Sequence, residues 1–183
     1  MLDVLPDVLP LGDPRLRLVS ARVGDLTDPS FALDARRLVE TLEAFRARHG
    51  FGRGIAAPQI GVARRFIALN LGQGPFVIAN PEITWASAQT FTMWDDCMCF
   101  PYLLVRVRRH LSISVRYTDE QGQEREWVRL DQPTSELLQH EIDHLNGVLA
   151  IDLAIDRDSI ISRAAFEASP DLFRAQVDYA IGG

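Results

Sequence analysis

One short run of residues constrains this chain more than any other: His140-Glu141-Ile142-Asp143-His144, which has the form H-E-x-x-H. On a helix, side chains four positions apart lie on one face, with β-carbons roughly 5–6 Å apart. His140 and His144 can therefore hold one metal ion, with Glu141 pointing to the flank of that ion. Such a run also arises by chance on an ordinary polar helix, so its meaning depends on the rest of the chain.

The surrounding pattern predicts an α+β fold built on that helix. Asp131-Gln132-Pro133 indicates a helix start and Asn146-Gly147 a helix end, because glycine readily adopts a left-handed cap. A second, amphipathic helix is predicted at residues 31–49, and a last helical segment from residue 160 to 180, interrupted at Ser169-Pro170. Short strands are expected at residues 65–69, 76–79, 111–117 and 124–130. We therefore expect antiparallel strands packed around the helix that carries H-E-x-x-H.

Length, composition and charge bound the class of protein. At 183 residues, with 47% hydrophobic and 24% charged residues, the chain is expected to form one domain over residues 1–183. The net charge of −6 predicts neither direct nucleic-acid binding nor a polybasic membrane anchor, and Arg106-Val107-Arg108-Arg109 is expected on a solvated strand face. The amino-terminal residues lack a signal-peptide pattern, and no window reaches the ~18 apolar residues of a membrane span. A cytoplasmic protein is expected.

The third metal ligand decides the chemistry, and three candidates remain from the residues alone. The extended pattern H-E-x-x-H-x-x-G-x-x-H is followed as far as Gly147, but the position of its last histidine holds Ala150. Glu167 lies at a suitable distance downstream for a thermolysin-type protease, which takes a glutamate from a later helix. The remaining candidate is a thiolate from Cys97 or Cys99, because a disulfide between cysteines separated by one residue would be badly strained.

Two longer motifs carry a resemblance to a known family. Residues 52–59, Gly-Arg-Gly-Ile-Ala-Ala-Pro-Gln, resemble the G-Φ-G-Φ-A-A-x-Q motif of peptide deformylases, with Arg53 at a usually apolar position. Residues 139–147 resemble the Q-H-E-Φ-D-H-L-x-G motif of the same family. Residues 11–17 and 80–83 are also similar to it, so the resemblance covers nearly the whole chain. It implies a deformylase-like fold and hydrolysis of the formyl group from the N-terminal methionine of new polypeptides.

The middle motif keeps its cysteine but departs from the family pattern. Deformylases usually have E-G-C-Φ-S, where this chain has Asp95-Asp96-Cys97-Met98-Cys99. The resemblance implies that Cys97, His140 and His144 hold one divalent ion, natively Fe²⁺, at a site that also suits Zn²⁺ or Ni²⁺. If the segment is extended, Cys99 faces the same side as Cys97 and closes the site as a fourth ligand. The matching family serine is not a ligand, which favours an open site with a position for water.

The resemblance also implies the other catalytic roles. Glu141 takes a proton from water and passes it to the departing amine. The side-chain amide of Gln59 and the backbone N–H of Met98 donate hydrogen bonds to the oxyanion. Gly52 and Gly54 let the backbone pass close to the substrate. The implied partners are N-formylated nascent peptides met at the ribosome exit, and a monomer is favoured.

Acidic residues at unusual positions bear on substrate choice. Asp95 is a shorter counterpart of a family glutamate and either pairs with Arg109 or remains an exposed acid. Asp96 replaces a family glycine, and Glu136 lies one helical turn before the first histidine of the motif. If either carboxylate lines the pocket that receives methionine in the family, a longer polar or cationic side chain would compete better. If both point to solvent, the preference is unchanged.

A function from another class also remains open. An altered cleft that has lost deformylation would leave a metal-holding, peptide-binding module. The retained Glu141 argues against this interpretation, because a purely structural metal site has no use for a general base beside the ion.

Overall fold

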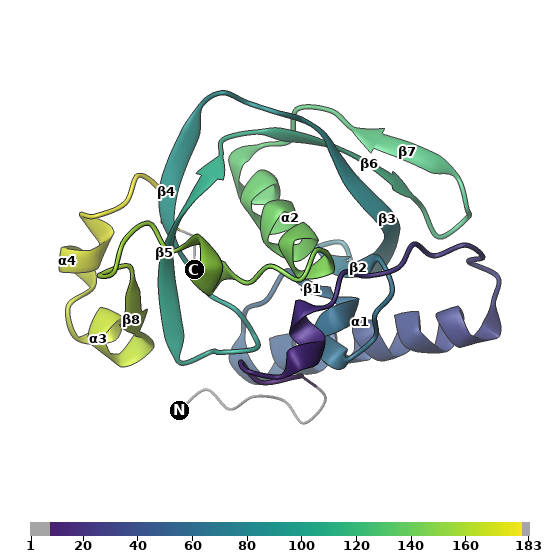
Figure 1. The fold of residues 1–183 in the computed structure, drawn as a ribbon, viewed down its shortest axis with the longest axis horizontal. Coiled ribbons are helices and arrows are strands. Elements are labelled where there is room, and N and C mark those ends of the chain that lie inside the picture. Colours follow the sequence, from purple (N-terminus) through teal and green to yellow (C-terminus); the bar gives the residue numbers. More distant parts are fainter. Residues whose placement is uncertain (1–7, 181–183) are drawn as a thin grey trace.

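Helix α2 (Gln132–Leu145) lies at the centre of the fold and is surrounded by strands (Figure 1). The structure, a computed structural model, describes residues 8–180. Asp131 caps the first turn by accepting a hydrogen bond from Thr134 N at 3.0 Å, and Pro133 stands where its missing N–H costs nothing. Most of the helix is buried, including the side chains of the H-E-x-x-H histidines. The predicted central helix is confirmed with its bounds.

The strands form two antiparallel sheets around α2. One sheet has five strands in the order β1-β2-β3-β6-β7, and the other has three in the order β4-β5-β8. The five-stranded sheet comprises β1 (Gly54–Ala56), β2 (Phe66–Asn70), β3 (Pro75–Ala86), β6 (Ile113–Thr118) and β7 (Glu124–Trp127). The three-stranded sheet comprises β4 (Thr90–Asp95), β5 (Leu103–His110) and β8 (Ile160–Ser162). The predicted α+β class is therefore confirmed.

Helix α1 (Pro29–His49) covers the outer side of β1, β2 and β3 (Figure 1). Asp28 caps it through Ser30 N at 2.9 Å, and Gly50 ends it in the left-handed conformation. The remaining helical segments are short: η1 (Pro14–Arg17), η2 (Ala57–Ile60), η3 (Ala150–Leu153), α3 (Arg163–Ala168) and α4 (Pro170–Arg174). No helix among residues 8–180 is both long and apolar enough to cross a membrane.

Two apolar clusters hold these layers together. One joins α1 to the sheets through residues such as Leu38 and Phe66, and the other joins the back of α2 to the five-stranded sheet through residues such as Leu138 and Ile67. Burying each such side chain stabilises the fold by about 1.5–3 kcal/mol. The apolar face of α2 thus fixes its rotation, and its histidine face is turned toward β4 and the loop that follows it.

Several predicted elements differ in the structure. The segment expected to be helical from residue 160 begins instead as β8, which pairs with β5 at Ile161↔Leu104, and helix α4 ends at Arg174 rather than continuing to residue 180. The break at Ser169-Pro170 is confirmed. Strand β3 extends well beyond the expected residues 76–79, while β7 ends before the expected residue 130. Strands β1 and β4 were not predicted, and of β5 only the arginine run at residues 106–109 was expected to be a strand.

The expectation of a solvated arginine run is wrong for part of it. In β5 the residues alternate, so Arg108 is exposed while Val107 and Arg109 are buried. Arg109 is only 4% exposed because two acids meet it inside the protein. The single domain predicted for residues 1–183, like the amino-terminal pattern, includes residues outside the described range and stays a prediction.

Gly147 provides a test of how the end of α2 is packed. Its φ is +73°, and a β-carbon there would lie 2.5 Å from the backbone oxygen of Arg17. Gly147→Ala should therefore destabilise the fold beyond the about 1–2 kcal/mol of left-handed strain alone. Gly122→Ala is the matched control, because its φ is +76° and nothing lies within 4 Å of the added carbon. Urea unfolding of both variants measures the difference, and equal losses would show that the close approach is unimportant.

Candidate metal centre

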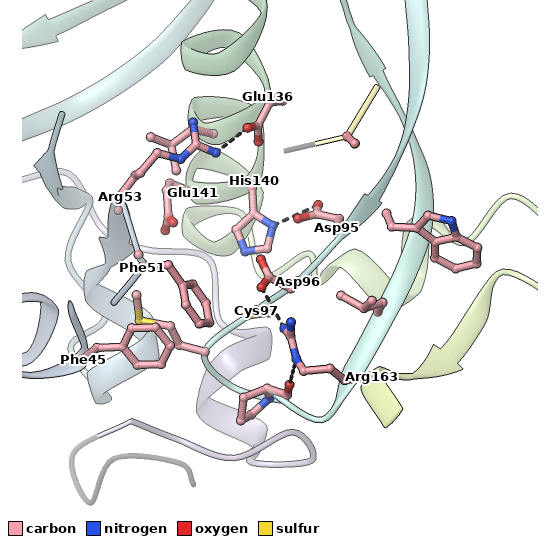
Figure 2. A pocket seen from close by; sticks show the side chains of 18 of the residues that line it. Phe45, Phe51, Arg53, Asp95, Asp96, Cys97, Glu136, His140, Glu141 and Arg163 are labelled. Carbon is pink, nitrogen blue, oxygen red and sulfur yellow. Dashed lines mark hydrogen bonds and ion pairs between the residues drawn. The ribbon is translucent and has the colours of Figure 1, made fainter. Parts of the chain in front are cut away.

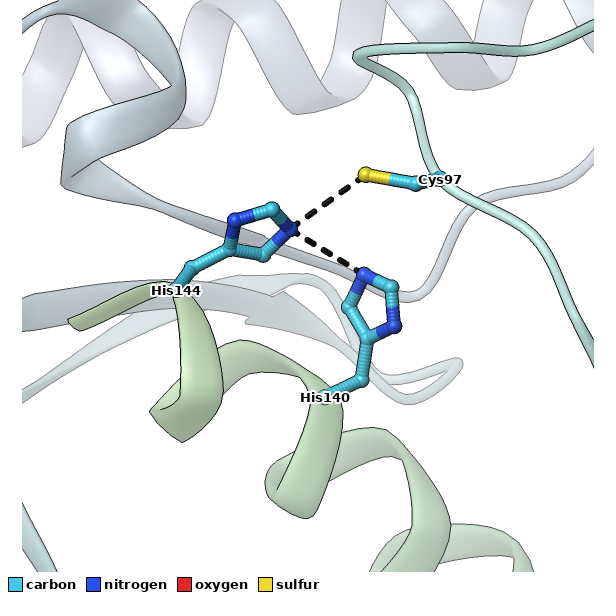
Figure 3. A group of neighbouring side chains, drawn as sticks. All are labelled: Cys97, His140 and His144. Carbon is cyan, nitrogen blue, oxygen red and sulfur yellow. Dashed lines mark hydrogen bonds between the residues drawn. The ribbon is translucent and has the colours of Figure 1, made fainter. Parts of the chain in front are cut away.

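Three buried donor atoms converge beside the central helix (Figure 3). Nε2 of His144 lies 3.2 Å from Nε2 of His140 and 3.3 Å from Sγ of Cys97. The histidines come from successive turns of α2, and Cys97 comes from the loop after β4. Among residues 8–180 this is the group of histidine, cysteine and acidic side chains placed to hold an ion together.

The spacing of these donors fits a tetrahedral metal ion. Bonds of about 2.0–2.1 Å to nitrogen and 2.3 Å to sulfur place neighbouring ligand atoms roughly 3.3–3.6 Å apart. The observed separations of 3.2 and 3.3 Å match that edge length closely. Two imidazoles and one thiolate suit borderline cations such as iron, zinc and nickel. The residues therefore fit one divalent ion, with three of its ligands supplied by the described part of the chain.

A chain of buried charges orients the first histidine. The Nδ1–H of His140 donates to Asp95 Oδ2 at 3.0 Å, which leaves Nε2 facing the other donors. Arg109 donates to the same carboxylate at 2.9 Å and also to Asp143 on α2. The predicted Asp95–Arg109 pair is thus confirmed. The second acidic partner of Arg109, Asp143, belongs to the H-E-x-x-H run. No role was assigned to Asp143 from the sequence.

The charges in this chain shift the pKa values of its members. Burial opposes ionisation of Asp95, but the charges of His140 and Arg109 outweigh it and lower the pKa of that carboxyl. Burial also disfavours the charged form of His140, yet Asp95 raises its pKa to about 10. Burial and the neighbouring Cys99 raise the pKa of the Cys97 thiol. Because ligands bind in their deprotonated forms, metal binding here must displace protons from His140 and Cys97.

Glu141 is held next to the three donors without being one of them. It is buried, and its Oε2 has no hydrogen-bond partner among the described residues. Burial raises the pKa of its carboxyl to about 7, although the charge of His140 acts in the opposite direction. Gly54 makes room for it, because a β-carbon there would lie 3.1 Å from Glu141 Oε1. A carboxyl with a pKa near neutrality therefore lies beside the three donor atoms.

Gln59 reaches the centre from η2. Its Oε1 accepts a hydrogen bond from Ala56 N at 2.8 Å, which turns its amide NH₂ toward the sulfurs of Cys97 and Cys99, each 3.7 Å away. Gln59 is 1% exposed, so this orientation is fixed by packing. Met98 is buried next to Cys97 and lines a cavity beside the three donors.

The suggestion of Cys99 as a fourth ligand rests on an extended segment, and that premise is wrong. The chain turns after Cys97, where Phe100 N donates to Cys97 O at 3.1 Å. Within the described part of the chain, the cluster able to hold an ion does not include Cys99. Glu167 is exposed on α3 and is not in the cluster either, so the thermolysin-type alternative has no support in the geometry.

A cavity of about 500 Å³ opens onto the centre (Figure 2). Gly52, Gly54 and Glu141 line it, and so do both acids proposed to influence substrate choice. Neither acid is free in solvent: Glu136 pairs with Arg53, and Asp96 pairs with Arg163 at 2.8 Å. Gly52 adopts φ +114°, and a β-carbon there would meet Phe45 and Met98. Five aromatic side chains complete the walls: Phe45, Phe51, Trp94, Phe166 and Tyr179.

Arg163 was not predicted from the sequence. This arginine donates to Asp96 and, through Nε, to Pro101 O at 2.6 Å, so it spans the loop that carries Cys97. Its own backbone N–H donates to Tyr102 O at 2.8 Å. Asp96 and Arg163 are 67 positions apart, and no spacing rule links an acid to a base at that distance. The position of Asp96 in place of a family glycine was the single available hint.

Comparison with known proteins places the whole arrangement in one family. The family model described as polypeptide deformylase matches residues 5–159. A peptide deformylase of Thermotoga neapolitana is 38% identical over 141 residues, which cover 77% of this chain and 82% of the relative. The crystal structure of peptide deformylase from Thermotoga maritima superposes with a TM-score of 0.72 at 34% identity, covering 81% and 97% of the two chains. That of a peptide deformylase from Synechococcus elongatus in complex with actinonin gives 0.75 at 30%, covering 86% and 84%.

The metal ligands can be separated from their neighbour by substitution. Cys97→Ser and His144→Ala should each weaken metal binding by about tenfold or more, because each removes one of three protein ligands. Cys99→Ser is the matched control and should keep the metal. Metal content after dialysis against graded chelator measures this. Undiminished metal in both ligand variants, or loss in the control alone, would contradict the assignment.

Proposed function

The chain belongs to the polypeptide deformylase family, whose members are metal-dependent hydrolases that remove the N-formyl group from nascent peptides, and on this premise we propose how its residues perform that reaction. Cys97, His140 and His144 hold one divalent ion. When bound, such an ion polarises the formyl oxygen and lowers the pKa of water to near neutrality. The rest of the reaction falls to the side chains around the ligands.

Glu141 acts as the general base and then as the general acid. Its carboxyl has a pKa of about 7 and an oxygen without a described partner, so it can accept a proton from water near neutral pH. The same carboxyl then delivers that proton to the nitrogen of the departing amine. This unpartnered carboxyl beside three converging donors is the observation that carries the proposal, because a structural metal site has no need of it.

Gln59 and Met98 stabilise the oxyanion that forms when the formyl carbon is attacked. The Gln59 amide has its oxygen anchored on Ala56 N, so its NH₂ points toward the centre before substrate arrives. A donor held in this way loses little entropy on reaction, and one well-placed donor contributes about 3–4 kcal/mol to the transition state. The backbone N–H of Met98 supplies the second donor in the proposed arrangement.

The native metal is proposed to be ferrous iron. A mixed imidazole and thiolate site accepts iron, zinc and nickel, so the donors alone do not choose. The family resemblance favours iron, and both cysteines are free thiols. Metal analysis of protein purified without oxygen, set against protein purified in air, tests this assignment, because ferrous iron is the member of the set that oxygen oxidises.

The proposed setting is the cytoplasm, at the ribosome exit, where formylated amino termini first emerge. A thiolate ligand and a second free thiol are compatible with a reducing compartment. We treat residues 1–183 as one domain that acts as a monomer. Sedimentation of the metal-loaded protein tests the monomer, and a concentration-dependent dimer would contradict it.

The reaction class can be tested by comparing acyl groups. The metal-loaded protein should hydrolyse a formylated methionyl peptide and leave the matching acetylated peptide and internal peptide bonds intact. A formyl carbon carries hydrogen where an acetyl carbon carries a methyl group, which a buried centre of this kind has little room to accept. Release of formate and of free amine is measured for each peptide. Cleavage of internal bonds would instead indicate a peptidase.

Glu141→Gln tests the general base. The amide keeps the size of the side chain but cannot carry the proton, so turnover should fall by roughly 10²–10⁴-fold while the metal is retained. Glu167→Gln makes the same chemical change on the exposed face of α3 and should alter neither quantity. The kcat of metal-loaded wild type and both variants is compared on one formylated peptide. Near-normal kcat in Glu141→Gln would mean that another group is the base.

A further inference from the structure

Two departures from the family pattern meet each other in the cavity. Arg53 occupies a usually apolar position in the first motif, and Glu136 lies 83 residues later on α2. Their side chains form an ion pair (Figure 2). Arg53 Nη1 also donates to Pro133 O at 2.8 Å. Each residue by itself would be a misplaced charge. Together they form a neutral polar wall.

This wall adjoins the reactive centre. Glu136 stands one helical turn before the ligand His140, on the same face of α2. Arg53 immediately precedes Gly54, whose missing side chain leaves room for the carboxyl of Glu141. Figure 2 shows the pair on one side of His140 and the Asp96–Arg163 pair on the other. A side chain that extends along α2 from a formyl group at the centre therefore meets Arg53 and Glu136.

The pair presents the guanidinium rather than the carboxylate to the cavity. The side chain of Glu136 is 3% exposed, whereas that of Arg53 is 30% exposed. A guanidinium has five N–H donors, and the contacts described for Arg53 engage Nη1 and Nη2 once each. Donors consequently remain for a bound molecule. Burial raises the pKa of Glu136 to about 7, although the charge of Arg53 acts in the opposite direction. Above that pH the carboxylate balances the charge of Arg53, and the wall offers hydrogen bonds without a net positive charge.

The two ion pairs of the cavity argue against a preference for cationic side chains. Both carboxylates that would attract a cation are already bound to arginines, Glu136 to Arg53 and Asp96 to Arg163. A cationic side chain would have to displace a guanidinium, and a wholly apolar one would cover donors without satisfying them. A side chain that brings an acceptor and no charge avoids both costs.

We propose that the Arg53–Glu136 pair makes the cavity select N-formyl peptides whose first side chain ends in a neutral hydrogen-bond acceptor. The amide of glutamine and the sulfoxide of oxidised methionine belong to this class, and norleucine is the apolar side chain of similar length. This inference rests on the proposed function, since it assigns the cavity to the residue that follows the formyl group. Arg53 and Glu136 are thus specificity-determining residues.

The test measures kcat/KM for formylated tripeptides that differ in the first residue: glutamine, methionine sulfoxide, methionine, norleucine, glutamate and lysine. Metal-loaded wild type should favour glutamine and methionine sulfoxide over norleucine. The double variant Arg53→Met, Glu136→Leu replaces the pair by apolar side chains of similar size. It should lower the glutamine-to-norleucine ratio by about tenfold or more, because a site built to hydrogen-bond a substrate group rejects the analogue that lacks it.

A matched control uses an exposed ion pair outside the cavity. Arg116 on β6 and Glu82 on β3 form an ion pair, with 3.0 Å between Nη2 and Oε2. The double variant Arg116→Met, Glu82→Leu makes the same chemical change at this exposed pair. This control should keep the wild-type ranking. The single variant Glu136→Gln keeps the shape of the wall but removes its negative charge. Its relative kcat/KM for the formyl-glutamate peptide should rise, because the charge of Arg53 is no longer balanced.

Three outcomes would overturn the inference. Norleucine could be preferred by the wild type, the double variant could keep the wild-type ratio, or Glu136→Gln could leave glutamate unchanged. Failure of the proposed function looks different, because metal-loaded wild type would then release formate from none of the peptides. Shifted ratios in the cavity variants, with an unchanged control, support the inference.

Discussion

The buried charge of Arg109 joins the elements that make the site. It comes from β5, pairs with Asp95 at the end of β4, and pairs again with Asp143 on α2. Asp95 then holds the ring of His140, so one guanidinium fixes strand, helix and ligand together. Removing one partner of such a buried network leaves an uncompensated charge, at a cost of about 3–5 kcal/mol. The orientation of His140, a proposed metal ligand, therefore depends on Arg109, which reaches it only through Asp95.

The sequence could predict what local spacing determines. The cap at Asp131 and the interval between His140 and His144 defined the central helix and two ligands, since both depend on helical geometry alone. Cys97 was identified as a ligand from the family resemblance. No spacing rule links a loop residue to a histidine on a helix that follows much later in the chain. The burial of Arg109 escaped prediction because its second partner, Asp143, comes from α2, 34 positions away. Strand β8 was mistaken for helix because its three residues are extended by pairing with β5.

The unusual residues of the cavity show why departures from a motif are best interpreted in pairs. Arg53 and Glu136, taken one at a time, suggest a damaged apolar pocket, and Asp96 suggests a distorted ligand loop. In space each acid has an arginine partner. The side chains proposed for catalysis lie together around Glu141, while the chemical character of the cavity wall departs from the family pattern. Deformylation and altered recognition are therefore compatible in one structure.

The outer wall of the cavity is formed in part by residues that lie beyond the region matched by the family model. That match ends at residue 159, whereas Arg163, Phe166 and Tyr179 line the cavity. Helices α3 and α4 contain no buried residues, so substitutions along them cost the fold little. Natural variation can accumulate in this wall without disturbing the ligands on α2. The outer wall is therefore freer to vary than the wall that Arg53 and Glu136 form beside His140.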